Sequence, residues 1–110
     1  VEAAKRAMAN LAEVVHRAAA QGVLRDPTIG SVDPAAAACL ADEEKAGGVG
    51  GPLPLATHQA MMHAWAALHG FVCLEAYGHL DWFPAEARDG LFRAQVDLAG
   101  RSIGLPAQTG

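Results

Sequence analysis

The residues best suited to chemistry gather on one side of a predicted helix in the middle of the chain. His58, Met62, His69 and Cys73 fall within a sector of roughly 60° if successive residues advance by about 100°. His69 and Cys73 are four residues apart, so both could reach one soft metal ion or a haem. No carboxylate or second cysteine pair completes a ligand set. We therefore predict no metal and no cofactor, with a metal or thiol sensor at His69 and Cys73 as an alternative to a packed helix face.

The same two residues are the only candidate pair for nucleophilic catalysis. A catalytic thiol usually lies at an exposed helix N-terminus and takes its base from elsewhere in the fold. Cys73 and His69 instead fall in the middle of an apolar helix, so we predict that the chain is not an enzyme. Cys39 and Cys73 show no disulfide spacing. Small apolar thiols of this kind fit a reducing cytosol, and we expect a cytoplasmic protein.

The helix that carries these residues belongs to the longest charge-free run of the chain. No Asp, Glu, Lys or Arg occurs between Lys45 and Glu75. From Ala60 onward, apolar residues fall on every side of this helix, and such a helix must be covered on every side. Histidines and other polar residues within the run argue against a membrane span. We expect either a ligand cavity or a second subunit against this helix.

The pattern along the chain predicts an all-α fold in a single domain over residues 1–110. Helices are expected over about residues 2–21, 34–45, 57–78 (beginning near Leu55 or Thr57) and 84–103. No segment alternates apolar and polar residues over the length of a strand. Hydrophobic residues make up 52% of the chain, but many are alanines and aromatics are only 5%, so the core is expected to be thin and to benefit from a partner. The residues expected to begin or end helices are, in chain order, Gly22, Asp33, Pro34, Gly78, Pro84 and Gly104.

The last two predicted helices form an antiparallel pair, because only residues 79–83 join them. Each of their glycines, Gly70, Gly78, Gly90 and Gly100, costs a helix about 1 kcal/mol relative to alanine. A stable helix keeps such residues where another helix approaches closely. Two such hairpins, one from each subunit, would make a four-helix bundle.

Part of this helix pair resembles a known family. Trp65, His69 and Gly70, followed by residues 71–75 (FVCLE) and later by residues 91–93 (LFR), resemble the C-terminal regulatory domain of TetR-type bacterial transcription regulators. The branch concerned is the one named for its Trp-His-Gly signature. The resemblance is good over residues 57–105 and weaker over residues 3–26, where residues 18–25 (AAAQGVLR) are similar to the helix exit before the signature helix. Residues 27–56 match poorly and are longer than that connection usually is.

The resemblance implies how the chain is organised. Residues 1–26 would supply a helix of the pocket wall, residues 27–56 a connector with a short helix and a Gly-rich loop, and residues 57–105 the dimerisation helix pair. The chain begins at Val1 inside a helical pattern, and we expect that the DNA-binding helices precede it. The net charge of −4 lacks the basic patch that nucleic acid binding needs. Operator DNA would therefore be bound only through that missing N-terminal domain.

The expected ligand is a small apolar or amphipathic effector. A mostly apolar wall with few polar groups is typical of small-molecule sites, and methionines adapt to different ligand shapes. An ordinary core stripe would have the same composition. The candidate ligand-binding residues are Met8, Leu11, Val15, Met61, Met62, Trp65, His69 and Cys73.

The expected protein partner is a second copy of the chain. The other surface of the last two helices would form the homodimer contact, unless the last helix merely closes a monomer core. A standalone helical interaction module without a ligand is the alternative function. The candidate dimer residues are Leu68, Val72, Glu75, His79, Leu91, Phe92, Gln95, Val96, Ala99 and Ile103.

Overall fold

The computed structural model describes residues 2–46 and 53–106, and the side chains of residues 2–5, 7, 8 and 43–46 lie outside that description. All regular structure in the described part is helical, which confirms the predicted all-α fold. The elements in chain order are α1 (Glu2–Ala20), α2 (Pro34–Ala46), α3 (Leu55–Ala76) and α4 (Ala85–Ile103).

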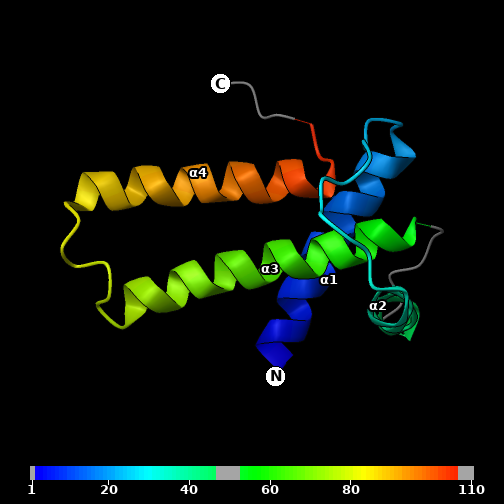
Figure 1. Ribbon diagram of the computed structural model, residues 1–110, viewed down its shortest axis with the longest axis horizontal. Helices are drawn as coiled ribbons and strands as arrows, with labels where there is room; N and C mark the ends of the chain where they lie inside the picture. Colours follow the sequence, from blue (N-terminus) through cyan, green and yellow to red (C-terminus); the bar gives the residue numbers. More distant parts are fainter. Residues whose placement is uncertain (1, 47–52, 107–110) are drawn as a thin grey trace.

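The long helices α3 and α4 lie side by side as the predicted antiparallel hairpin (Figure 1). Helix α1 crosses α3 steeply near one end of this hairpin, and α2 packs against the N-terminal half of α3 (Figure 1). Helix α3 thus contacts all three other helices. No described helix is both long enough and apolar enough to cross a membrane.

The helices begin and end close to the capping residues predicted from the sequence. The Asp33 carboxylate accepts a hydrogen bond of 2.9 Å from the backbone N–H of Ala36 and so caps α2. Pro84 directly precedes α4, which begins at Ala85 rather than at the proline itself. Helix α4 ends at Ile103, and Gly104 is its C-cap residue. These short-range signals were readable from the sequence because each acts within one turn of its helix.

Gly104 also holds the end of α4 against the segment between α1 and α2 (residues 21–33), which is called the connector from here on. Its φ of +105° lies in the left-handed region, which favours glycine. A Cβ at this position would collide with the backbone carbonyl of Arg25. The Gly104 carbonyl accepts a hydrogen bond of 2.8 Å from the Arg25 N–H, and the Ser102 carbonyl accepts one of 2.9 Å from the Thr28 N–H. The connector is therefore fastened to the end of α4 by backbone contacts.

A second fastening joins the connector to α3 through the buried side chain of Gln59. Its amide nitrogen donates to the Ser31 carbonyl at 2.8 Å, and its amide oxygen accepts from the Asp33 N–H at 2.7 Å. The amide nitrogen also lies 3.1 Å from His63 Nε2. One side chain thus satisfies two backbone groups just before α2 begins, which sets where α2 meets α3.

The hydrophobic core lies where α1 crosses the α3–α4 hairpin. It is thin, as the alanine-rich composition predicts, because four of its seven buried residues are alanines. The buried core residues are Ala12, Val15, Ala60, Met61, Ala64, Ala99 and Ile103.

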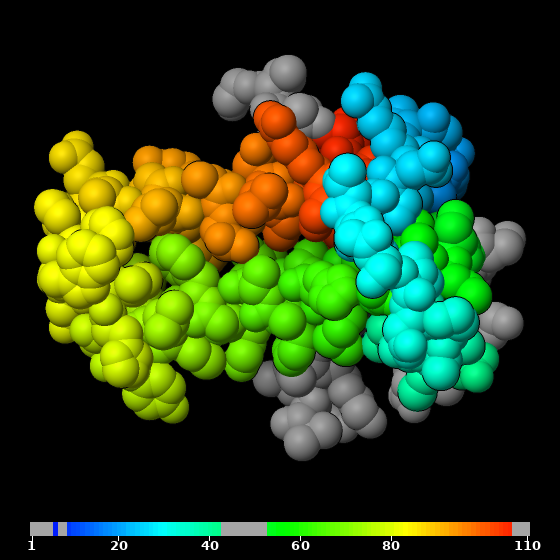
Figure 2. Space-filling model, in the orientation of Figure 1, coloured from blue at the N-terminus to red at the C-terminus, as the bar shows by residue number. Residues whose placement is uncertain are grey.

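The rest of the hairpin extends beyond the core. No residue from Trp65 to the end of α3 is buried, and none from the start of α4 to Leu98. We call this part the far end of the hairpin and the part packed by α1 and α2 the core end. On the face shown in Figure 2, no atoms of α1 or α2 cover the far end. Within the described part of the chain, the other elements therefore bury residues of the charge-free helix α3 only in its N-terminal half.

Candidate ligand cavity

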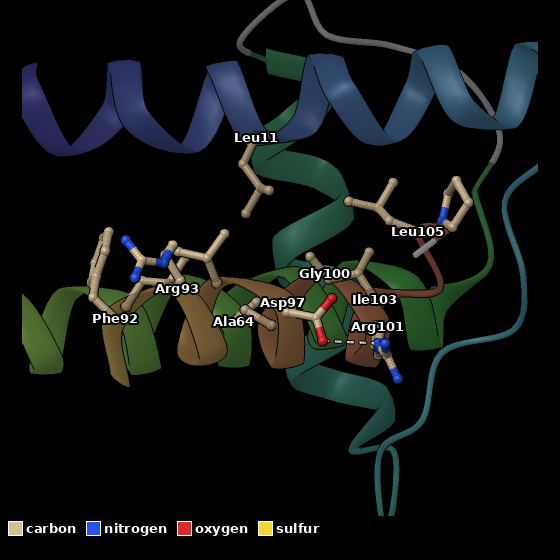
Figure 3. A pocket seen from close by; sticks show the side chains of 13 residues that line it. Leu11, Ala64, Phe92, Arg93, Asp97, Gly100, Arg101, Ile103 and Leu105 are labelled. Carbon is tan, nitrogen blue, oxygen red and sulfur yellow. Dashed lines mark ion pairs between the residues drawn. The ribbon is translucent and has the colours of Figure 1, made fainter. Parts of the chain in front are cut away.

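A cavity of about 580 Å³ lies between α1, α3 and α4 (Figure 3). Its volume falls within the range of small-molecule sites, about 300 to 1,000 Å³. Helix α4 supplies most of its wall, α3 and α1 supply the remainder, and the two residues after Gly104 close one end. The lining residues are Leu11, Ala64, Leu68, Phe92, Arg93, Val96, Asp97, Ala99, Gly100, Arg101, Ile103, Leu105 and Pro106.

The cavity has a packed floor and an exposed rim. Ala64, Ala99 and Ile103 are buried members of the core, so this part of the wall is held by packing. Phe92 and Val96 are exposed at the rim. The Phe92 ring packs against Phe71 of α3 at 5.6 Å between centroids, which limits its freedom. An apolar ligand that covers the exposed rim residues would remove their apolar surface from water, which favours binding.

The charged groups at the cavity carry an excess of positive charge. Arg101 Nε lies 3.0 Å from an Asp97 carboxylate oxygen, so these two charges largely offset each other. Arg93 forms no ion pair or hydrogen bond with the part of the chain that the structure describes. Two arginines and one aspartate thus line the cavity, in a chain whose net charge is −4.

Of the candidate ligand-binding residues, the structure places only Leu11 at this cavity. Val15 and Met61 are fully buried in the core, so no ligand reaches them without repacking. Met62 is half-buried on α3. The side chain of Met8 lies outside the described residues. A helical wheel cannot distinguish a core stripe from a cavity wall, because both are apolar.

Trp65, His69 and Cys73 lie along α3 outside the cavity, as a ladder one turn apart. The Trp65 and His69 rings stack at 5.1 Å between centroids with 12° between their planes. His69 Nε2 lies 3.6 Å from Cys73 Sγ. Trp65 and Cys73 are half-buried and His69 is exposed. The described residues contain no group of three or more His, Cys, Asp or Glu side chains that could hold a metal ion.

The family comparison decides the class of this chain. Residues 1–99 match the model of the tetracyclin repressor-like C-terminal domain. The chain belongs to this family. No curated protein and no solved structure matches it. The tetracyclin repressor-like C-terminal domain is a regulatory domain, not an enzyme, and the resemblance in the Trp65 region is confirmed.

The candidate dimer residues of this tetracyclin repressor-like domain do not share one surface. Leu68, Phe92 and Val96 line the cavity, whereas Ala99 and Ile103 are buried within the chain and not available to a partner as the domain stands. Gln95 is half-buried. The remaining candidates, Val72, Glu75, His79 and Leu91, are exposed.

An apolar stripe without charged residues runs along the hairpin, and Leu91 is its one member among the candidate dimer residues. Leu91 and Leu98 alternate with alanines at steps of four, three and four residues along α4. Leu74 on α3 and Tyr77, the C-cap residue of α3, belong to a stripe of similar spacing. This spacing keeps side chains on one side of a helix and is typical of helix–helix seams. We call these residues the hairpin face: Ala67, Gly70, Leu74, Tyr77, Ala87, Leu91, Ala94 and Leu98.

The hairpin face and the cavity lie on opposite sides of the α3–α4 pair. The Phe71–Phe92 contact marks where the two helices face each other. Leu74 lies roughly 60° around α3 from Phe71, and Leu98 lies roughly 120° around α4 from Phe92 in the same rotational sense. Leu68 lies roughly 60° from Phe71 and Arg93 roughly 100° from Phe92, both in the opposite rotational sense. In an antiparallel pair, equal senses lead to the same side, so a partner on the hairpin face would leave the cavity free.

Proposed function

We propose that this chain is the effector-sensing and dimerisation domain of a TetR-type transcriptional repressor in a bacterial cytoplasm. The observation that carries the proposal is the family match together with a largely apolar cavity of about 580 Å³. A small apolar or amphipathic effector binds in this cavity, and a separate N-terminal helix-turn-helix binds the operator. The effector shifts the protein towards a state in which the two DNA-reading heads no longer fit their operator.

The proposed subunit contact is the hairpin face. Its exposed side chains include Leu98, with 61% of its surface accessible, and Tyr77, with 79%. A Cβ on Gly70 would meet nothing within 4 Å in the chain, so this glycine leaves room for a close approach by another helix. Two hairpins packed through these faces form a four-helix bundle. This contact revises the candidate set, of which it keeps only Leu91.

Sedimentation equilibrium of the 110-residue chain tests the assembly. We expect a species of twice 11.4 kDa. Leu98→Asp places a charge within the proposed contact and should give monomers, because an unpaired buried charge is strongly unfavourable. Val72→Asp is the matched control, since Val72 is also exposed, at 49%, but lies on the cavity side. A monomeric parent chain, or a Leu98→Asp variant that stays dimeric, contradicts the proposed contact.

Differential scanning fluorimetry tests the cavity. Val96→Trp fills the rim of the cavity without touching the buried core, so it should abolish stabilisation by apolar small molecules that stabilise the parent chain. Unchanged stabilisation would place the effector elsewhere. Because Cys73 Sγ lies 3.6 Å from His69 Nε2, a thiol sensor is the second candidate function. In that case Cys73→Ser, and not Val96→Trp, would remove the response.

A further inference from the structure

We propose that the cavity selects ligands with an apolar body and a single carboxylate, and that Arg93 binds the carboxylate. This inference rests on the proposed function and adds the chemical class of the effector. It follows from three features of the cavity: the apolar walls, the charges that line it and the position of Arg93.

The walls favour an apolar ligand body. Leu11, Leu68 and Ile103 approach from three different helices. The exposed rim residues Phe92 and Val96 would be removed from water by a bound chain or ring, and burial of apolar surface favours the complex. A wholly polar ligand would bury little apolar surface of its own, and its polar groups would lack hydrogen-bond partners at the apolar walls.

The charges favour a ligand with one negative group. Asp97 is already engaged by Arg101 at 3.0 Å, so it opposes an incoming anion only weakly. Arg93 remains as the one lining charge without a partner in the described part of the chain. A guanidinium binds a carboxylate through two parallel hydrogen bonds, which are stronger than bonds between neutral groups. A cationic ligand would instead meet an excess of positive charge.

The position of Arg93 matches an elongated amphipathic ligand. Arg93 lies with Phe92 at one end of the cavity, and Leu105 lies at the other (Figure 3). The apolar side chains of Leu11 and Ile103 lie between these ends. A carboxylate on Arg93 therefore lets the apolar body of the ligand extend along the cavity towards Leu105.

Isothermal titration calorimetry with octanoate, 1-octanol and octylammonium tests the selection, because the three share one apolar chain and differ in the head group. The parent chain should bind octanoate about tenfold more tightly than 1-octanol, which corresponds to one charge-assisted hydrogen-bonding contact at a partly exposed site. Octylammonium should bind most weakly. The preference for octanoate should shrink as salt is added, since Arg93 is exposed.

Arg93→Gln should reduce octanoate to the affinity of 1-octanol and leave 1-octanol unchanged. Arg17→Gln is the matched control, because Arg17 is an exposed arginine of α1 paired with Glu13 at 3.3 Å and absent from the cavity lining. It should keep the full preference. A preference that survives Arg93→Gln, or an equal or tighter affinity for 1-octanol or octylammonium in the parent chain, overturns the assignment of a carboxylate to Arg93.

Val96→Trp separates this inference from the proposed function. If it blocks all three probes while Arg93→Gln changes nothing, the cavity binds ligands but does not select carboxylates. If no probe binds the parent chain, both the cavity and its selectivity are overturned. Octanoate that dissociates the dimer in sedimentation experiments would show that the cavity is a subunit contact, and it would overturn the ligand assignment as well.

Discussion

The core end and the far end of the α3–α4 hairpin are built from the same two helices but have opposite surroundings. At the core end, α1, α2 and the connector cover the hairpin, and Met61 and Ile103 are fully buried. At the far end no residue is buried, and Trp82 keeps 75% of its surface exposed. The difference indicates that the core end stabilises the fold of one chain, whereas the far end carries the exposed apolar side chains of the proposed subunit contact.

The largest expected effect tests how the core end is closed. Gly104→Ala should lower the free energy of unfolding by about 3 kcal/mol or more, because it combines a left-handed backbone with a collision against the Arg25 carbonyl. Gly90→Ala is the control within the same helix, since a Cβ there meets nothing within 4 Å. It should stabilise the chain by up to about 1 kcal/mol. Urea denaturation of both variants in parallel measures the difference, and equal effects would mean that the connector is not held by Gly104.

The next prediction compares one large side chain from each end. Met61→Ala should cost about 2 to 5 kcal/mol, because it empties a fully buried site. Leu74→Ala should change stability by less than about 0.5 kcal/mol, because Leu74 is exposed in the single chain. Both substitutions belong in the monomeric Leu98→Asp background, since dimerisation otherwise adds to the measured stability. A large loss for Leu74→Ala in that background would show that the far end stabilises the single chain after all.

A smaller effect is expected at the Gln59 fastening. Gln59→Leu leaves the Ser31 carbonyl and the Asp33 N–H without their partner and should cost about 1 to 3 kcal/mol. Hydrogen exchange should rise at Asp33 and at the start of α2 but not in α4. Gln95→Leu is the control, because Gln95 is a half-buried glutamine of α4 that makes no hydrogen bond within the described part of the chain. Identical exchange in both variants would contradict the role of Gln59.

The smallest effect is expected at the ladder outside the cavity. His69→Phe should change stability by less than about 0.5 kcal/mol, because His69 is exposed and phenylalanine can keep the stack on Trp65. It should leave octanoate affinity unchanged, because His69 does not line the cavity. If calorimetry shows that His69→Phe binds octanoate more weakly than the parent chain, His69 belongs to the ligand site, as the sequence alone had suggested.

The sequence by itself determined the fold class, the family and the approximate limits of the helices. Asp33, Pro34 and Gly104 act on the backbone within one helical turn, so their effects can be read without knowledge of the tertiary structure. The antiparallel pairing of α3 and α4 followed from the short link between them. The thin core followed from the many alanines and few aromatics.

Only the tertiary structure decided which apolar side chains face a ligand, a partner or the core. Both helices of the hairpin are apolar on more than one side. The periodicity of apolar residues therefore could not show that Val96 lines the cavity while Leu98 does not, or that Leu11 lines it while Met61 is buried in the core. That choice depends on the angle at which α1 crosses α3 and on where Gln59 and Gly104 hold the connector. These contacts join residues that lie far apart in the chain, and no local pattern of apolar residues encodes them.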